Sequence, residues 1–314
     1  MVVIMVVSFY PEKSGASSYF SPYSAPGEVQ LPHLYETQLS IHTGIRMDRL
    51  RWNIAGNNVN ILSELIVDDI EIIPIGLKTE ITRGNYTFFG NMAYGEIRDG
   101  TTTDRDYLAD DRRGLYSESI SKVSGNHAID LSGSIGRNID FKADRFRLAP
   151  VIGASWHRLK LYKTHGVQTV ATSGVTPPTG PFPGLASSYD ASWTSLWAGG
   201  NIRIQIISAL QLTASFHYHW FDYRADADWN LRQDLAHPVS FTHRASGDGF
   251  DAEITCKYAF TDRADISITF FYRDWLAKNG TDTTFFATGQ RAEIPLNEVS
   301  WESRSITAGI HYRF

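Results

Sequence analysis

Aspartates arranged in closely spaced pairs are the residues of this sequence best suited to chemistry. Asp104 and Asp106 form one such pair, Asp226 and Asp228 form a second, and Asp48 stands alone near the end of an alternating segment. An extended strand holds residues i and i+2 on one face, within reach of each other. Like charges held that close raise the pKa of one carboxyl group, so such a pair can carry one proton at neutral pH and act as acid and base.

The same aspartates have two plainer interpretations. An acidic rim can be simply solvated, and for any single aspartate this is the simpler explanation. A calcium site is the second, but the sequence lacks the ladder of oxygen ligands with a spaced Gly and Glu that an EF-hand has. No Ser-His-Asp order, zinc-ligand spacing or phosphate-binding loop is visible, so we expect no metal site.

Strict alternation of apolar and polar residues indicates how these aspartates are positioned. Residues 306–314 place Ile, Ala, Ile, Tyr and Phe at even positions, with Thr, Gly, His and Arg between them. The same period of two recurs in 266–272, 252–260 and 196–206, and it is typical of strands with one apolar face. A soluble sandwich would show it as well. The strands here exceed the usual length of about five or six residues and have aromatic residues near their ends, which favours a membrane barrel.

Composition and hydropathy agree with such a barrel. The 314 residues are 42% hydrophobic, 20% charged and 13% aromatic, with one cysteine, Cys256. These values exclude a disordered chain and a disulfide scaffold, and the net charge of −5 excludes the basic field that attracts nucleic acid. Mean hydropathy is −0.23, and no window has the roughly 18 consecutive apolar residues of a transmembrane helix. Barrel strands escape such a scan because lipid-facing and lumen-facing residues alternate.

The expected fold class is all-β, a ten-stranded antiparallel transmembrane β-barrel of the outer membrane. We expect its strands near 36–50, 60–82, 86–98, 126–138, 146–164, 191–207, 210–230, 239–259, 264–278 and 299–314. Short turns are expected at 82–85, 140–145, 208–209 and 261–263, and long loops at 51–59, 99–125, 165–190, 231–238 and 279–298. Outer-membrane barrels keep short turns on the periplasmic side and long loops outside. All five aspartates therefore reach the extracellular rim.

The alternation also predicts which way the aspartates face. In the first strand the apolar residues stand at odd positions, so Asp48 should point into the lumen. In the seventh strand the apolar residues stand at even positions, as do Asp226 and Asp228. Placing Asp226 and Asp228 inside therefore requires a β-bulge or a twist above the membrane.

A single folded domain is expected. Residues 35–314 should form the barrel with its long extracellular loops, and residues 1–34 form an N-terminal segment whose apolar start (MVVIMVV) we interpret as a signal-peptide remnant. We find no internal repeat and no interdomain linker, and we interpret the Pro/Gly-rich stretch 175–185 as an extracellular loop.

Several of these segments resemble the omptin family of ten-stranded outer-membrane endopeptidases, which cleave beside basic residues. The similarity spans about residues 38–314. It is carried by the order and spacing of 43–49 (TGIRMDR), 104–107 (DRDY), 116–119 (YSES), 216–230, 244–247 (RASG) and 306–314 (ITAGIHYRF).

The resemblance implies a role for each aspartate. Asp48 and Asp226 match the acids that line the family's pocket for an Arg or Lys side chain, where charge-assisted hydrogen bonds hold a guanidinium group strongly. Asp104 and Asp106 match the family's catalytic aspartate pair. Asp228 matches the aspartate of its Asp-His dyad.

The sequence departs from the family at one catalytic position. Two residues after Asp228, where the family has the dyad histidine, stands Asn230. The family's hydrolysis uses a water that this histidine activates, and an amide cannot accept the proton. Losing a general base typically costs about 10²–10⁴-fold in rate, so weak or altered proteolysis is expected.

Two kinds of compensation are open. The remaining aspartates could act as an aspartic dyad, with one carboxyl ionised and its neighbour protonated. Alternatively His127, which opens the fourth strand, or His237, in the fourth long loop, could replace the missing imidazole. Each of these histidines is more simply explained as a solvated or interfacial residue.

The resemblance further implies lipopolysaccharide as an activating lipid on the barrel wall, and no other cofactor is expected. A basic run in the fifth strand, His157, Arg158, Lys160 and Lys163, could meet lipid phosphates. The expected partners are a cationic peptide or protein substrate and outer-membrane lipid. We expect a monomer in the outer membrane of a Gram-negative bacterium, with its active face extracellular.

The leading functional hypothesis is cleavage of cationic peptides or proteins beside Arg or Lys by a carboxylate-activated water. The alternative is a catalytically impaired barrel of the same type that acts as a surface binding or adhesion protein. A diffusion pore is disfavoured because side chains fill most of the lumen of so small a barrel.

Overall fold

The protein's structure is a computed structural model that describes residues 35–141 and 145–314. The expected N-terminal segment, residues 1–34, lies outside the described residues. No helix long and apolar enough to span a membrane occurs in the part of the chain that the structure describes.

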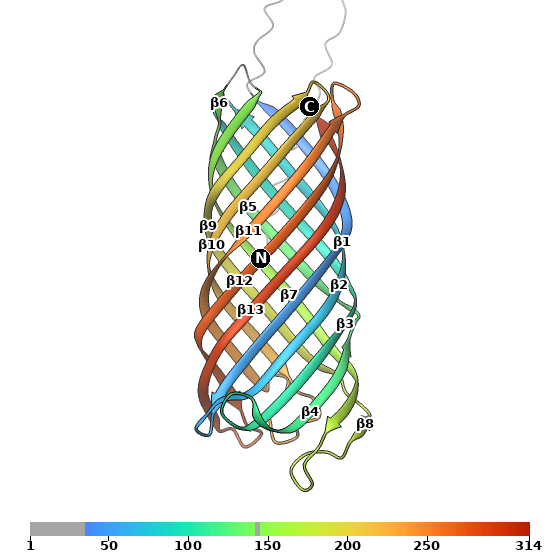
Figure 1. Ribbon diagram of the computed structural model, residues 1–314, viewed down its shortest axis with the longest axis vertical. Helices are drawn as coiled ribbons and strands as arrows, with labels where there is room; N and C mark the ends of the chain where they lie inside the picture. The colour runs from blue at the N-terminus through green and yellow to red at the C-terminus, as the bar shows by residue number, and fades with distance from the viewer. Residues whose placement is uncertain (1–34, 142–144) are drawn as a thin grey trace, which may run out of the picture. The chain divides into compact units, whose positions relative to one another are not determined.

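A closed ring of ten antiparallel strands forms the barrel within the described residues (Figure 1), which confirms the expected fold class. In chain order the ring consists of β1 (Glu36–Gly56), β2 (Val59–Arg83), β3 (Tyr86–Ala109), β4 (Arg113–Val123) with β5 (Asn126–Arg137), β7 (Phe146–Val170), β9 (Ser187–Ile207), β10 (Leu210–Asp228), β11 (Phe241–Ala259), β12 (Ala264–Phe285) and β13 (Arg291–Arg313). The strands β4 and β5 count as one because both lie between β3 and β7. Two short strands, β6 (Ile139–Phe141) and β8 (Gly180–Phe182), each pair with β7.

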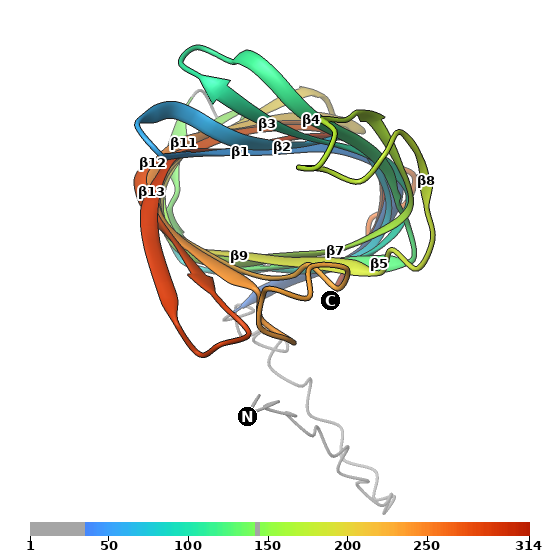
Figure 2. The same cartoon turned by 90° about the horizontal axis from the view of Figure 1, so that it is seen from below.

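The first and last strands close the ring. β1 and β13 pair without interruption from Gln38 opposite Arg313 to Asn53 opposite Glu298, and the view along the barrel shows the continuous wall (Figure 2). Hydrocarbon offers no hydrogen-bond partner to an open sheet edge, so closure is the condition for a sheet to cross a membrane. Short turns join strands at one end, called here the short-turn end, and the longer connections lie at the other, the long-loop end.

The strands extend further toward the long-loop end than the sequence predicted. Part of the expected loop 99–125 is strand, because β3 continues to Ala109 and β4 returns from Arg113. The expected loop 279–298 is likewise mostly strand, since β12 ends at Phe285 and β13 begins at Arg291. These extensions keep their backbone hydrogen bonds and enclose apolar side chains, which stabilises them without a bilayer.

The outward face of the ring is apolar over the height of a membrane, as the alternation predicted. Its exposed side chains include Ile41, Ile45, Ile75, Phe88, Met92, Ile152, Leu196, Phe216, Ile254, Ile268, Phe270, Ile306 and Ile310. This belt begins at the short-turn end and reaches Tyr94 on β3 and Trp220 on β10. Beyond them the outward positions become charged, with Glu96 and Asp222 next in line. The closed wall and the belt identify a membrane barrel and not a sandwich.

The lumen has two parts. At the long-loop end it is filled by buried apolar and aromatic side chains, which include Trp52, Leu65, Tyr189, Trp193, Tyr223, Trp275, Leu296 and Trp301. Toward the short-turn end, polar side chains line a cavity of about 330 Å³. Between the two parts lies a layer of buried charged residues.

A pair of neighbouring substitutions on β10 tests the orientation of the wall. Phe216 is 53% exposed on the belt, whereas Ser215 lines the lumen cavity. A charge on the lipid face near mid-membrane costs about 2–4 kcal/mol, so Phe216→Arg should destabilise the barrel by that amount. Ser215→Arg, whose guanidinium enters the polar cavity, should cost much less. Unfolding by denaturant in lipid vesicles measures both, and equal losses would contradict the assigned faces.

Candidate functional site

Asp48 faces the lumen, as expected, but the protein's own arginine already binds it. Its side chain is buried, and the guanidinium of Arg46 donates two hydrogen bonds to it, one of 2.7 Å from Nε to Oδ1. The indole Nε1 of Trp301 donates a third, 3.0 Å from Oδ2. A second carboxylate, Asp130, accepts from Arg46 Nη1 at 2.6 Å. A substrate cation could therefore reach Asp48 only by displacing Arg46.

Asp226 lies on the outward face of β10, the side that its even position shares with the apolar residues of the strand, so the lumenal position that its implied pocket role needs is not reached. Its neighbours Ala225 and Ala227 are buried while Asp226 is exposed. The pairing of β10 with β11 runs without a register shift from Leu210 to Ala227, so the bulge needed to turn Asp226 inward is absent. Asp226 makes no ion pair within the described residues. Its assignment as a substrate-binding residue stays a prediction.

Asp104 and Asp106 lie on the inner side of β3, above a register shift near Asp99. Asp104 forms an ion pair with buried Lys163, whose Nζ is 2.9 Å from Oδ2. Asp106 lies at the long-loop end, well beyond the membrane belt. Burial and then the negative charge of Asp104 raise the pKa of Asp106 to about 6. The pair therefore combines a neutralised carboxylate with one that retains its proton more readily.

Asn230 is held in place by three local hydrogen bonds, and its correspondence to the family's dyad histidine stays a prediction. Its carbonyl oxygen accepts hydrogen bonds from the backbone of Ala186 at 2.9 Å and from the Ser187 hydroxyl at 3.1 Å. Its amide group donates to the carbonyl of Gly184 at 2.8 Å. The Asn230 side chain thus joins the segment after β10 to the start of β9 and the residues before it.

The imidazole that contacts Asp228 belongs to His237. The Nδ1 atom of His237 lies 2.6 Å from Asp228 Oδ1, and the His237 side chain is 36% exposed. The other alternative, His127, stacks on Tyr94 with ring centroids 5.6 Å apart on the opposite side of β5 from the lumen. In the sequence analysis His237 is one alternative base, but only the path of the loop shows that it returns to Asp228, nine positions earlier.

Lys163 links the aspartate pair to the segment that follows β10. Its Nζ lies 4.7 Å from the centroid of the Trp229 ring, while it also binds Asp104. Trp229 packs against the aromatic core, whereas Asp228 shares the outward register of Asp226. The structure therefore brings Asp226, Asp228 and His237 to one outer face, and it sets Asp104 and Asp106 on the inner one.

The basic run of β7 is divided between the two faces of the wall. His157 and Lys163 are buried in the lumen, and only Arg158 and Lys160 point outward. Arg158 is bound by Asp190 through two hydrogen bonds, with 2.7 Å from Nε to Oδ1. The alternation of a strand excludes the continuous lipid-facing basic run that the sequence suggested.

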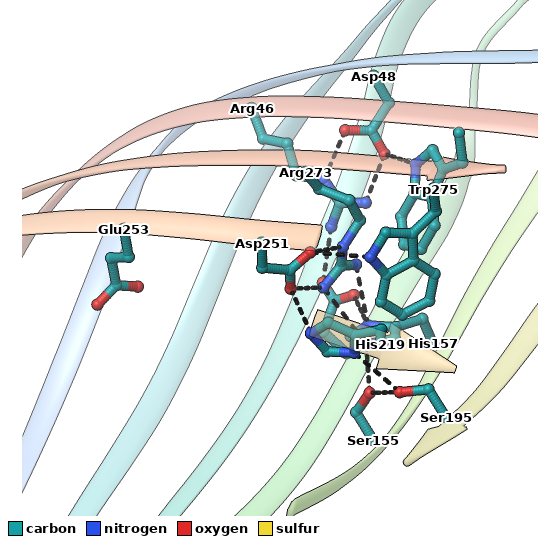
Figure 3. Close-up of polar contacts among 12 residues, drawn as sticks. Arg46, Asp48, Ser155, His157, Ser195, His219, Asp251, Glu253, Arg273 and Trp275 are labelled. Carbon is teal, nitrogen blue, oxygen red and sulfur yellow. Dashed lines mark hydrogen bonds and ion pairs between the residues drawn. The ribbon is translucent and has the colours of Figure 1, made fainter. Parts of the chain in front are cut away.

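Arg273, Asp251 and Trp275, which the sequence analysis did not single out, form a buried polar cluster in the barrel. Arg273 binds Asp251 with 2.9 Å and 2.6 Å hydrogen bonds, and Trp275 Nε1 donates to the same carboxylate at 3.0 Å (Figure 3). His157 and His219 both contact the Trp275 ring, with centroid distances of 5.3 Å and 4.7 Å. The sequence holds a signal for this cluster: charged residues in the middle of a strand, at positions that face the lumen, need a partner on another strand.

Comparison with known proteins gives a family and a fold. The family described as Pom, Protochlamydia outer membrane protein, matches residues 40–314. No curated protein matches the chain. Among solved structures, the outer membrane protease OmpT from Escherichia coli is 14% identical, with 89% of this chain and 97% of that chain covered and a TM-score of 0.73. The outer membrane protein OprG from Pseudomonas aeruginosa is 11% identical with a TM-score of 0.38, covering 88% of this chain and 95% of its own. At such identities the likeness shows the fold alone.

The ion pair of Asp48 gives a first test of its role. Asp48→Asn leaves the buried Arg46 with a weaker partner, and breaking a buried pair on one side costs about 3–5 kcal/mol. The matched variant Asp226→Asn alters an exposed carboxylate and should stay within about 0.5 kcal/mol of the parent. Denaturant unfolding in vesicles measures both. An Asp48→Asn barrel as stable as the parent would show that Asp48 has no structural role.

The raised pKa of Asp106 predicts a pH-dependent stability of the long-loop end. A carboxyl group whose pKa rises from 3.8 to about 6 on folding contributes stability that is complete below pH 3.8 and lost as pH rises through about 6. Asp106→Asn cannot ionise and should remove this part of the pH dependence, whereas Asp248→Asn, at an exposed position, should keep it. Limited proteolysis of the loops between about pH 4 and about pH 8 measures the effect. Identical profiles for Asp106→Asn and the parent would contradict it.

Proposed function

The chain belongs to the Protochlamydia outer membrane protein family, and from that premise we propose that this outer-membrane barrel is an endopeptidase that acts at its long-loop end through Asp228 and His237. The observation that carries the proposal is the 2.6 Å contact between Asp228 Oδ1 and His237 Nδ1. The long-loop end is then the extracellular, active face, as in outer-membrane barrels generally.

The chemistry requires a histidine with one nitrogen held and the other available. A carboxylate on Nδ1 fixes the imidazole with its proton on that nitrogen and leaves Nε2 to accept a proton from water. Because the His237 side chain is 36% exposed, water can reach Nε2. The activated water then attacks the peptide carbonyl without a protein nucleophile. His237 thus supplies the base that Asn230 cannot.

Asp226 supplies recognition in this proposal. It stands two residues from Asp228 on the same outward face, which an extended strand spaces by roughly 7 Å. Its exposed carboxylate can bind an Arg or Lys side chain next to the bond that is cleaved. Asp48 takes no part, because Arg46 occupies it. We therefore propose a weaker preference for basic residues than two converging carboxylates would give.

Substitution of His237 tests the proposed base. His237→Asn should lower kcat for a fluorogenic Arg-Arg peptide by about 10²–10⁴-fold, since it removes the general base. The matched variant His127→Asn removes an imidazole of the barrel wall and should leave kcat unchanged. Asp226→Asn should mainly raise KM. Assays include lipopolysaccharide vesicles, and undiminished hydrolysis by His237→Asn would refute the proposal.

A second candidate function is surface binding without proteolysis. It is favoured by the neutralisation of two acidic positions, Asp48 by Arg46 and Asp104 by Lys163. In that case no parent or variant protein cleaves the peptide, yet an Arg-rich peptide binds at low salt and binds less well to Asp226→Asn. A diffusion pore is not proposed, because the aromatic core and the charged layer fill the long-loop half of the lumen.

A further inference from the structure

A continuous chain of hydrogen bonds follows the inner wall of the barrel over four neighbouring strands, and Figure 3 shows its members His157, Ser155, Ser195 and His219. His157 Nδ1 lies 2.6 Å from Asp130 Oδ1, and His157 Nε2 lies 2.9 Å from Ser155 Oγ. Ser155 Oγ lies 2.8 Å from Ser195 Oγ, which in turn lies 3.0 Å from His219 Nδ1. The strands β5, β7, β9 and β10 each contribute to this chain. It takes no part in the peptide-cleaving site on the outside of β10.

The first half of the chain has the connectivity of a catalytic triad. A triad needs a carboxylate on Nδ1 of the histidine and a serine hydroxyl on Nε2 within about 2.6–3.2 Å, and Asp130, His157 and Ser155 meet both conditions. Arg46 holds the Asp130 carboxylate from its other oxygen at 2.6 Å. The acid is therefore fixed in its ionised form, and the histidine is fixed in the orientation that accepts a proton from Ser155.

The hydrogens next to Asp130 can be assigned in one direction: Ser195 donates to Ser155, Ser155 donates to His157, and His157 donates to the Asp130 carboxylate. At the other end, Ser195 contacts His219 Nδ1, and Asp251 Oδ2 lies 3.3 Å from His219 Nε2. In this assignment the Ser195 hydroxyl points at Ser155 Oγ, where it stabilises negative charge as the proton leaves. Each serine contacts one histidine, but the carboxylate contact is 2.6 Å at His157, which is beside Ser155, and 3.3 Å at His219, which is beside Ser195.

Ser155 lies on the wall of the lumen cavity, whereas Ser195 does not. The lumen cavity of about 330 Å³ is lined by Ser155, His157 and Arg273, but Ser195 is not part of its wall. This cavity shares Glu80, Arg147 and Lys257 with a second cavity at the short-turn mouth. A small molecule can therefore approach Ser155 from the short-turn end, while the aromatic core blocks the other side.

We propose that Ser155 is the nucleophile of a second hydrolytic site, which cleaves small polar carboxylic esters inside the lumen. Ser155 Oγ bonds to the ester carbonyl carbon while its proton passes to His157 Nε2. The carbon–oxygen bond to the alcohol then breaks, and the alcohol oxygen takes that proton. Water cleaves the acyl-serine in the same way, giving its proton to His157, which returns it to Ser155 as the acid is released.

The surroundings of Ser155 fit an oxyanion intermediate and a small polar substrate. Arg273 Nη2, which also donates to Asp251 Oδ2 at 2.6 Å, lies 3.5 Å from His157 Nε2, so a positive charge lies near the serine and its base. The cavity wall carries hydroxyl, amide and charged side chains, among them Asn91, Ser132, Asn201 and Thr213. These side chains can donate hydrogen bonds to, and accept them from, a polar substrate.

A serine-directed phosphorylating reagent tests the proposal on the folded, full-length barrel in vesicles. Diisopropyl fluorophosphate should give one adduct, and peptide mass mapping should place it on Ser155. Ser155→Ala should abolish labelling, while Ser195→Ala, which removes only a supporting hydrogen bond, should slow it less than about tenfold. His157→Gln should slow labelling by about 10²–10⁴-fold, and hydrolysis of 4-nitrophenyl acetate should follow the same order.

Access to Ser155 is measured separately. Ser155→Cys in a Cys256→Ser background is treated with a small methanethiosulfonate, and heat-dependent gel migration confirms that each barrel is folded. If the cysteine reacts but Ser155 of the parent protein does not take up the phosphoryl group, Ser155 is not activated and the proposal is overturned. If neither reacts, the lumen is closed to ligands and the proposal is overturned as well. Peptide cleavage is a separate readout, so failure here leaves the Asp228–His237 proposal untouched.

Discussion

The arrangement of side chains inside this barrel depends on the ion pairs that the buried guanidinium groups of Arg46 and Arg273 form. Arg46 connects Asp48 on its own strand with Asp130 on β5, across the lumen. Arg273 on β12 binds Asp251 on β11 and reaches His157 on β7. A buried charge that lacks hydrogen-bond and ion-pair partners destabilises the folded state strongly. Each charged group in the layer therefore fixes the positions of its partners. This layer connects strands that are not neighbours in the ring. It also separates the aromatic core at the long-loop end from the polar cavity toward the short-turn end.

The same layer decides where chemistry can occur. Asp48 is paired with Arg46 in this layer. Nearer the long-loop end, Lys163 neutralises Asp104 in the same way. Carboxylates committed to internal cations cannot attract a substrate cation. The two sites that we propose lie elsewhere, at the outward end of β10 with Asp228 and His237 and on the lumen wall with Ser155 and His157. Both use a histidine whose Nδ1 is held by an aspartate.

Two barrels can share this fold and still differ in the positions of the side chains at their rims. The OmpT protease and this chain superimpose with a TM-score of 0.73 at 14% identity. The ring fixes strand order and tilt, but the direction of each side chain at the rim depends on single bulges and on loops. Asn230 shows the consequence, since three local hydrogen bonds hold it as a loop anchor. The function resides in such local contacts.

The sequence by itself determined the ring, its two faces and the inward direction of Asp48, because a period of two is a local property of each strand. Ile268 is exposed to lipid and Asp48 is buried, as their parity predicted. Only the tertiary structure decided that no β-bulge turns Asp226 inward, that Arg46 binds Asp48, and that His237 contacts Asp228. It also decided that the strands continue through 99–125 and 279–298. The reason is physical: the partner of Arg46 on β5 lies 84 positions away along the chain, and closure of the ring, not local propensity, brings such residues together.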